Sequence, residues 1–180
     1  MADTTSTTAA RTGAAPAARW LGWGLVSGFL AGVVFMALNS WFAGSMGNPA
    51  LAPFKVVATL AQGPPPPQAT VWVGMAIHSV LSALLGLVFA ALVAPALMRN
   101  RSAGWLVWAG LIYGGLVYVV DFQILSRFVG QFSAFLAATN QPLELAVHLV
   151  FGAVLAALLL LAKPGLSAAR NPSPVTQAGA

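Results

Sequence analysis

Charged residues are scarce in this chain. Only 6% of its 180 residues are Asp, Glu, Lys or Arg, against about a quarter in a soluble domain, and 59% are hydrophobic. Cysteine is absent, which excludes disulfides, thiolate metal sites and cysteine-ligated iron–sulfur clusters. The sequence also lacks a Walker loop, a G-x-S-x-G elbow, an H-E-x-x-H pair and a dinucleotide fingerprint. We therefore predict an integral membrane protein without enzymatic activity.

Acidic residues are rarer than basic ones. The chain has three Asp or Glu residues and eight Lys or Arg residues, which gives a formal net charge of +5. The basic residues do not form the clustered patch that nucleic-acid binding requires, because they are scattered at the ends of apolar stretches. We expect the lipid bilayer, and no nucleic acid, as the partner of this surface.

Long apolar stretches dominate what is present. Each reaches the roughly 20 residues that a helix needs to cross about 30 Å of hydrocarbon. None shows the alternation of a barrel strand. The predicted spans are 20–43, 72–97, 104–125 and 143–162. They predict an all-α, polytopic transmembrane four-helix bundle, with its membrane domain at 20–163.

The basic residues predict how the bundle is oriented. Six of the eight lie at one end of the spans, and only Lys55 and Arg127 lie at the other. The positive-inside rule then places both termini in the cytoplasm. The tails, 1–19 and 164–180, are small, polar and interrupted by proline, which predicts disorder. The composition is typical of a bacterial inner membrane protein.

The two non-cytoplasmic connections contain short helical patterns. In LAPFKVVATLAQ (51–62) apolar residues recur at helical spacing until a glycine and four prolines end the pattern. In RFVGQFSAFLAATNQP (127–142) the aromatic residues gather on one helical side. Both predict a short helix lying at the outer membrane surface.

The chain contains a weak internal repeat. GLVSGFLAG (24–32) compares with GLIYGGLVY (110–118), and AIHSVLSALLGLVFA (76–90) compares with LAVHLVFGAVLA (145–156). Both halves start in the cytoplasm in this topology, so we predict two parallel helix-pair repeats about an axis along the membrane normal.

Small residues and tryptophans occupy regular places in the spans. Glycines that recur at helical spacing predict faces on which helices pack closely: Gly24, Gly28, Gly32, Gly86, Gly110, Gly114 and Gly152. The tryptophans lie near span ends, which predicts anchors at the lipid–water interface: Trp20, Trp23, Trp41, Trp72, Trp105 and Trp108.

Polar residues lie at a similar depth in every span. At about 1.5 Å per residue, each span carries a polar side chain less than about 10 Å from its outer end. On the second and fourth spans these residues belong to series at i+4 spacing that lead to Gly86 and Gly152, so they share one helical face with these glycines. We predict one polar cluster that opens towards the periplasm, formed by Asn39, His78, Asp121, Glu144 and His148.

Several roles for this cluster follow from its chemistry. Interhelical hydrogen bonds worth about 0.6 kcal/mol each would hold the bundle in register. Alternatively, His78 and His148 would ligate a haem b or, with Asp121 or Glu144, a divalent metal. A third role is proton relay or small-solute transport, although the cytoplasmic halves of the spans contain no His, Asp, Glu, Lys or Arg. A fourth is an accessory subunit, or a homo-oligomer, whose glycine faces pack on a partner.

The order of these features resembles a known family. A glycine-striped first span, Trp72 and His78 on the second, and HLVFGAVLA on the fourth are similar to the small bacterial four-helix inner-membrane proteins described as YagU-like. The likeness covers about 20–162. It implies the fold, the inner-membrane location and the importance of His78 and His148, without a reaction. The expected function is that of a non-enzymatic integral membrane protein.

Overall fold

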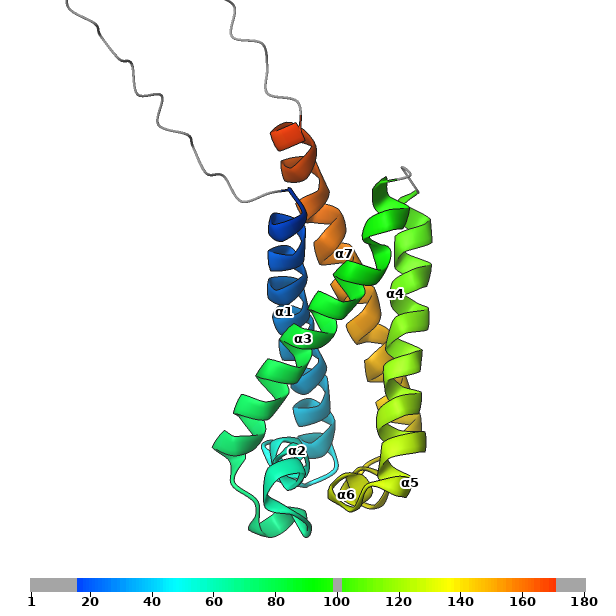
Figure 1. Ribbon diagram of the computed structural model, residues 1–180. Coiled ribbons are helices and arrows are strands. Elements are labelled where there is room, and N and C mark those ends of the chain that lie inside the picture. Colours follow the sequence, from blue (N-terminus) through cyan, green and yellow to red (C-terminus); the bar gives the residue numbers. More distant parts are fainter. Residues whose placement is uncertain (1–15, 99–101, 171–180) are drawn as a thin grey trace, which may run out of the picture.

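The protein is a helical bundle. The computed structural model describes residues 16–98 and 102–170, and within these ranges it contains helices and no strands. The long helices run side by side (Figure 1): α1 (Pro16–Ser45), α3 (Val71–Met98), α4 (Ala103–Tyr118) and α7 (Gln141–Arg170). The all-α bundle predicted from the apolar runs is confirmed.

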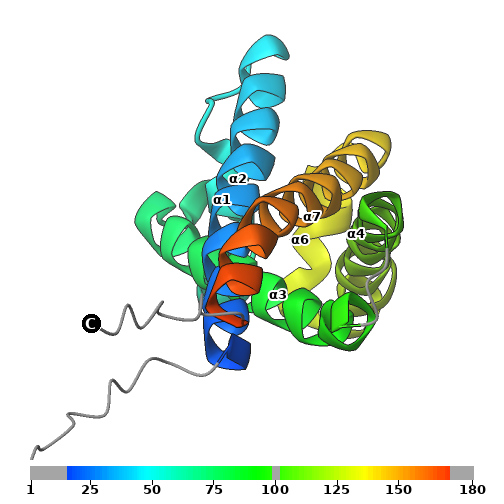
Figure 2. The ribbon, with the colours of Figure 1, turned by 90° about the horizontal axis from the view of Figure 1, so that it is seen from above.

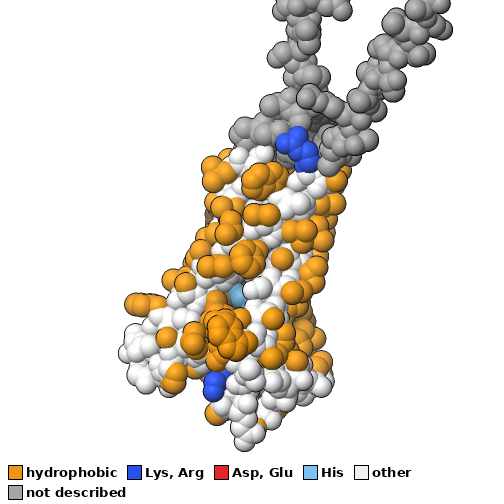
Figure 3. Space-filling view, turned by 90° about the vertical axis from the view of Figure 1, so that its left-hand side faces the viewer, with side chains coloured by type: hydrophobic (Ala, Val, Ile, Leu, Met, Phe, Trp, Pro, Cys, Tyr) orange, Lys and Arg blue, Asp and Glu red, His pale blue; other side chains and the backbone are white. Residues whose placement is uncertain are grey.

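Four helical segments are long and apolar enough to cross a membrane. They are Ala17–Ser45, Val71–Val93, Ala103–Phe128 and Gln141–Ala162. Hydrophobic side chains cover the long face seen in Figure 3, and Lys or Arg side chains show only near its two ends. This is the surface of a multi-pass membrane protein, because lipid tails accept apolar side chains and exclude charge.

The helices extend beyond the predicted spans. Helix α1 begins at Pro16, and α7 continues to Arg170, so 164–170 is helical where we expected a disordered tail. Once a helix exists, each added residue forms one further backbone bond, which favours continuation. The rest of the predicted tails, 1–15 and 171–180, lies outside the described residues.

The bundle consists of two helix pairs. Helix α1 packs along α3, and α4 packs along α7. The two pairs are joined where α1 and α7 pack side by side (Figures 1 and 2). At all seven predicted packing glycines, an added Cβ would come within 3.0 Å of a facing helix. Gly28, for example, lies against the backbone of Ser82 and Gly86, and Gly114 lies against that of His148.

The same contacts set the register of the internal repeat. Gly24 and Gly28 meet Gly86 and Ala90, just as Gly110 and Gly114 meet Gly152 and Ala156. Gly86 thus corresponds to Gly152. One turn away Ser82 corresponds to His148, and after a second turn His78 corresponds to Glu144. The two histidines are not equivalent in the repeat, which the comparison of the two sequence segments did not reveal.

An apolar core fills the half of the bundle nearer the chain termini. Its buried side chains include Phe89, Leu106, Phe151, Leu155 and Leu159.

Trp20 belongs to this core. It is only 7% exposed, and its indole Nε1 donates to the carbonyl of Ala90 at 2.8 Å. The prediction that Trp20 is an interface anchor is therefore wrong, because the core provides a partner for its N–H. Trp41, Trp72 and Trp108 are strongly exposed, as interface anchors should be.

Short helices occupy the opposite end, which we call the α2–α6 end (Figure 1). They comprise α2 (Ala52–Gln62), the 3-10 turn η1 (Pro66–Gln68), the π-helical segment η2 (Val119–Leu125), α5 (Ser126–Phe128), the 3-10 turn η3 (Gly130–Phe132) and α6 (Ser133–Ala138). Helix α2 has a proline in its first turn and ends at Gly63, whose φ of 76° suits glycine. A short helix forms in each of the two connections, as predicted, and its position at the outer membrane surface stays a prediction.

Candidate functional site

A cavity of about 240 Å³ lies between the helices at the α2–α6 end, and we call it the polar cavity. All four long helical segments contribute to its wall. Helix α2 lines it with Val56, Val57 and Leu60, and η3 and α6 line it with Phe132 and Phe135. These short helices therefore cover part of the cavity.

The structure brings all five residues of the predicted polar cluster to the wall of this cavity. They come from every long segment: Asn39 from α1, His78 from α3, Asp121 from the π-helical continuation of α4, and Glu144 and His148 from α7. Their surroundings are apolar, with five phenylalanines among the lining residues.

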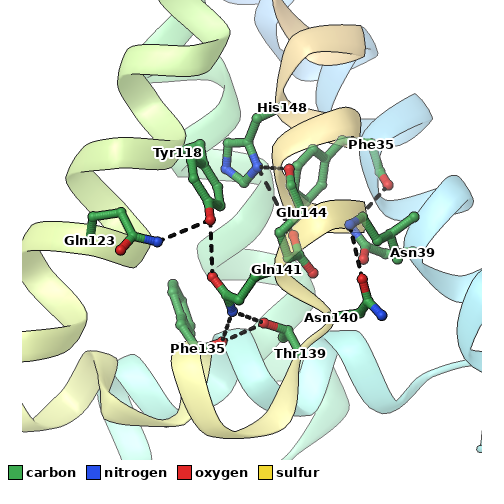
Figure 4. A network of polar contacts seen from close by, with 11 residues as sticks. Phe35, Asn39, Tyr118, Gln123, Phe135, Thr139, Asn140, Gln141, Glu144 and His148 are labelled. Atoms are coloured by element: carbon green, nitrogen blue, oxygen red, sulfur yellow. Dashed lines mark hydrogen bonds and ion pairs between the residues drawn. The ribbon is translucent and has the colours of Figure 1, made fainter.

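His148 and Glu144 are almost fully buried, each 5% exposed. The His148 Nδ1 lies 2.6 Å from the backbone carbonyl of Glu144 and 4.0 Å from its carboxylate Oε2 (Figure 4). Because a carbonyl only accepts, Nδ1 carries the hydrogen, and Nε2 of the neutral ring is left as an acceptor.

His78 bonds in a similar way. Its Nε2 lies 2.9 Å from the carbonyl of Gly32 on α1, so Nε2 donates and Nδ1 is left as an acceptor. The Ser82 hydroxyl lies 3.3 Å from the same nitrogen. Both imidazoles thus donate to backbone, and neither donates to a carboxylate.

Aromatic rings hold the two imidazoles in place. Phe35 stacks on His78 at a ring distance of 5.6 Å and meets His148 edge to face at 4.8 Å. Phe122 approaches His148 edge to face at 5.5 Å. Both imidazoles therefore pack against Phe35 at the wall of the cavity.

Asn39 lies at the edge of the polar cavity beside the Glu144 carboxylate (Figure 4). It is 5% exposed, and its Nδ2 donates to the Phe35 carbonyl at 3.5 Å. The amide oxygen is an acceptor in every orientation of the group.

Asp121 lies in a local irregularity of the third span. We predicted a regular helix over 104–125, but Val119–Leu125 is π-helical, and Phe122 is the buried residue of this segment. Asp121 lies in this segment and contributes to the wall of the polar cavity. Such π segments are frequent at functional sites. Within the described residues, no side chain hydrogen-bonds the Asp121 carboxylate.

A second polar network lies beside the cavity, and sequence reasoning missed it. The Tyr118 hydroxyl donates to Gln141 Oε1 at 3.2 Å and accepts from Gln123 Nε2 at 3.0 Å (Figure 4). Gln141 Nε2 in turn donates to Thr139 Oγ1 at 3.0 Å. The sequence feature that could have indicated this network is the presence of Gln123 and Gln141 near the ends of two spans. The network ties η2 to the start of α7.

The arrangement of the described lining residues does not support the metal interpretation of the cluster. Within residues 16–98 and 102–170, no three His, Asp or Glu side chains lie close enough together to hold a metal ion. The cavity of about 240 Å³ is also smaller than the roughly 300–1,000 Å³ of pockets for drug-sized ligands, and haem is a large ligand. The haem and metal interpretations of His78 and His148 gain no support from this arrangement.

The comparisons with known proteins assign no role to this site. No family model matches the chain, and no curated protein or solved structure matches it. The YagU-like resemblance therefore stays a prediction that rests on the sequence motifs alone.

A surface pocket of about 510 Å³ adjoins the polar cavity. It lies between the end of α1, α2 and the start of α7, and it shares Asn39 and Glu144 with the cavity. Lys55 lines this surface pocket but not the cavity, and its Nζ donates to the Pro67 carbonyl at 3.0 Å. Asn39 and Glu144 thus stand between the surface of the α2–α6 end and the cavity.

Proposed function

We propose that this chain is a non-enzymatic integral protein of the bacterial inner membrane that binds a small molecule in the polar cavity. The observation that carries the proposal is the convergence of polar side chains from all four spanning segments on one covered, mostly apolar cavity. Apolar walls with a few convergent polar groups are the usual make-up of small-molecule sites.

The hydrogen bonds favour binding over a purely structural role. If the cluster served only to hold the helices in register, its polar groups should bond to one another across the helices. Two contacts do join helices, because His78 donates to the Gly32 carbonyl of α1 and Asn39 bonds the Glu144 carboxylate, but His148 donates to the backbone of its own helix. The Asp121 carboxylate has no side-chain partner within the described residues, so it is available to a ligand.

Binding is a better proposal than autonomous transport. The apolar core between the polar cavity and the chain termini contains Phe89, Leu106 and Leu155, each no more than 1% exposed. A polar solute would have to cross this packed region, where no described His, Asp, Glu, Lys or Arg side chain belongs to the core to receive it.

The proposed topology predicts which positions are accessible from outside the cell. The chain has no cysteine, so an introduced one is unique. In spheroplasts, a membrane-impermeant maleimide should label Gln68→Cys at the α2–α6 end at once. It should label Ser102→Cys only after the membrane is permeabilised. The reverse pattern would show that the termini face the periplasm.

The binding proposal predicts a bound molecule that depends on the cavity. We expect native mass spectrometry of protein extracted in mild detergent to show a small-molecule adduct. The adduct should be lost in Val57→Trp, which fills the cavity from α2. Val33→Trp, at a position 51% exposed on the outside of α1, is the matched control and should retain it. A wild-type protein without any adduct, or an adduct that persists in Val57→Trp, would contradict the proposal.

A further inference from the structure

Among the described residues, the charged side chains that line the polar cavity are acidic. Asp121 and Glu144 contribute to the wall, and no described Lys or Arg does. The nearest basic groups have other partners: Lys55 donates to Pro67, and Arg127 donates to Gln123 at 2.9 Å. Within the described residues, neither carboxylate forms an ion pair with Lys or Arg. Buried carboxylates without a counter-charge are costly, so a cation in the cavity would be favoured.

The polar atoms left over in the cavity are acceptors. His78 and His148 use their N–H groups on backbone carbonyls, which leaves one ring acceptor on each neutral imidazole. Asn39 uses its Nδ2 on the Phe35 carbonyl and on one side of the Glu144 carboxylate, and it retains its own oxygen. Together with the two carboxylates, these groups match a ligand that carries N–H donors or positive charge.

The apolar part of the wall is aromatic. Its phenylalanines are Phe35, Phe122, Phe132, Phe135 and Phe151. The faces of aromatic rings attract cations, and the attraction grows when water is excluded. A site that combines such rings with carboxylates discriminates against anions and accepts an apolar group beside the charge.

We propose that the ligand of the polar cavity is a small organic cation, an alkyl- or arylammonium, held by Glu144 and Asp121 with its apolar group against the phenylalanines. This inference rests on the proposed binding function. An apolar cavity of about 150 Å³ holds benzene, so about 240 Å³ suits a molecule somewhat larger than benzene. Glu144 adjoins the surface pocket and is the first carboxylate that an entering cation meets.

Three probes of similar size separate charge from shape. Benzyltrimethylammonium is the cation, neopentylbenzene is its uncharged isostere, and phenylacetate is an anion. Isothermal titration of the purified full-length chain should show that the cation binds roughly 10- to 100-fold more tightly than the isostere, with phenylacetate weakest. Isostere or anion binding that equals cation binding would overturn the inference. The adduct seen by native mass spectrometry would still support a binding cavity.

Variants test whether Glu144 and Asp121 bind the positive charge of the ligand. Glu144→Gln and Asp121→Asn should each weaken benzyltrimethylammonium binding by roughly 10-fold or more, while neopentylbenzene binding stays the same and shows that the cavity is intact. Asp3→Asn removes the only other acid of the chain and is the matched control, with unchanged affinity. Unchanged cation affinity in both cavity variants would overturn the inference. So would a failure of all three probes to bind, whereas the adduct experiment decides the binding function separately.

Discussion

Replacing Gly114 by valine should separate α4 from α7 and strongly destabilise the protein. A Cβ at this position would lie 2.9 Å from the His148 carbonyl carbon and closer still to its oxygen. Backbone atoms of a packed helix cannot move aside as a flexible side chain can, so the helices must shift. Overpacking of this kind costs about 1–3 kcal/mol. The expected result is a fall of several degrees in the unfolding temperature, measured by circular dichroism in detergent.

The matched control lies on the same helix. Gly104 has no atom of another residue within 4 Å of its would-be Cβ, so Gly104→Val should leave the unfolding temperature unchanged or raise it slightly. Gly28→Val should behave like Gly114→Val, because Gly28 has the equivalent place in the α1–α3 pair. Equal unfolding temperatures for Gly104→Val and Gly114→Val would show that the glycine contact does not set the helix spacing.

Replacing Gly74 by valine should loosen the cover of the polar cavity. Gly74 of α3 lies against α2, where an added Cβ would be 2.6 Å from the Phe54 carbonyl carbon and 3.2 Å from the Ala58 nitrogen. At about 1–3 kcal/mol of overpacking, local opening of α2 becomes roughly 5- to 150-fold more frequent. A cysteine at Met36, a buried lining residue, should then react faster with a small maleimide by a comparable factor.

This prediction separates the cover from the bundle. Gly44→Val is the control and should not change the labelling rate, because a Cβ added at Gly44, near the end of α1, would have nothing packed against it within 4 Å. A separate apolar cluster joins α2 and α6 to η2, where Val56 packs with Phe122, Ala134 and Phe135. We therefore expect Gly74→Val to lower the unfolding temperature less than Gly114→Val. An equally large fall, without faster labelling, would mean that α2 is part of the bundle and does not move separately.

Much of the fold was predictable because its causes are local. The thickness of a bilayer sets the length of an apolar run, and helical periodicity places residues such as His148 and Gly152 on one face. The same periodicity and depth identified all five polar residues that line the cavity. Gly74 was missed because a single glycine without a repeat carries no packing signal until the partner helix is known.

The four apolar spans, the helix-packing glycines and the approximate depth of the polar residues could be predicted from the chain alone, because each depends on spacing along one helix. The burial of Trp20, the bonds from the histidines to backbone carbonyls and the π-helical turn at Asp121 became known only from the folded bundle. These features depend on which carbonyls, rings and helix faces meet across the bundle. The cavity itself exists only because α2 and α6 pack over the ends of helices that are distant in the sequence.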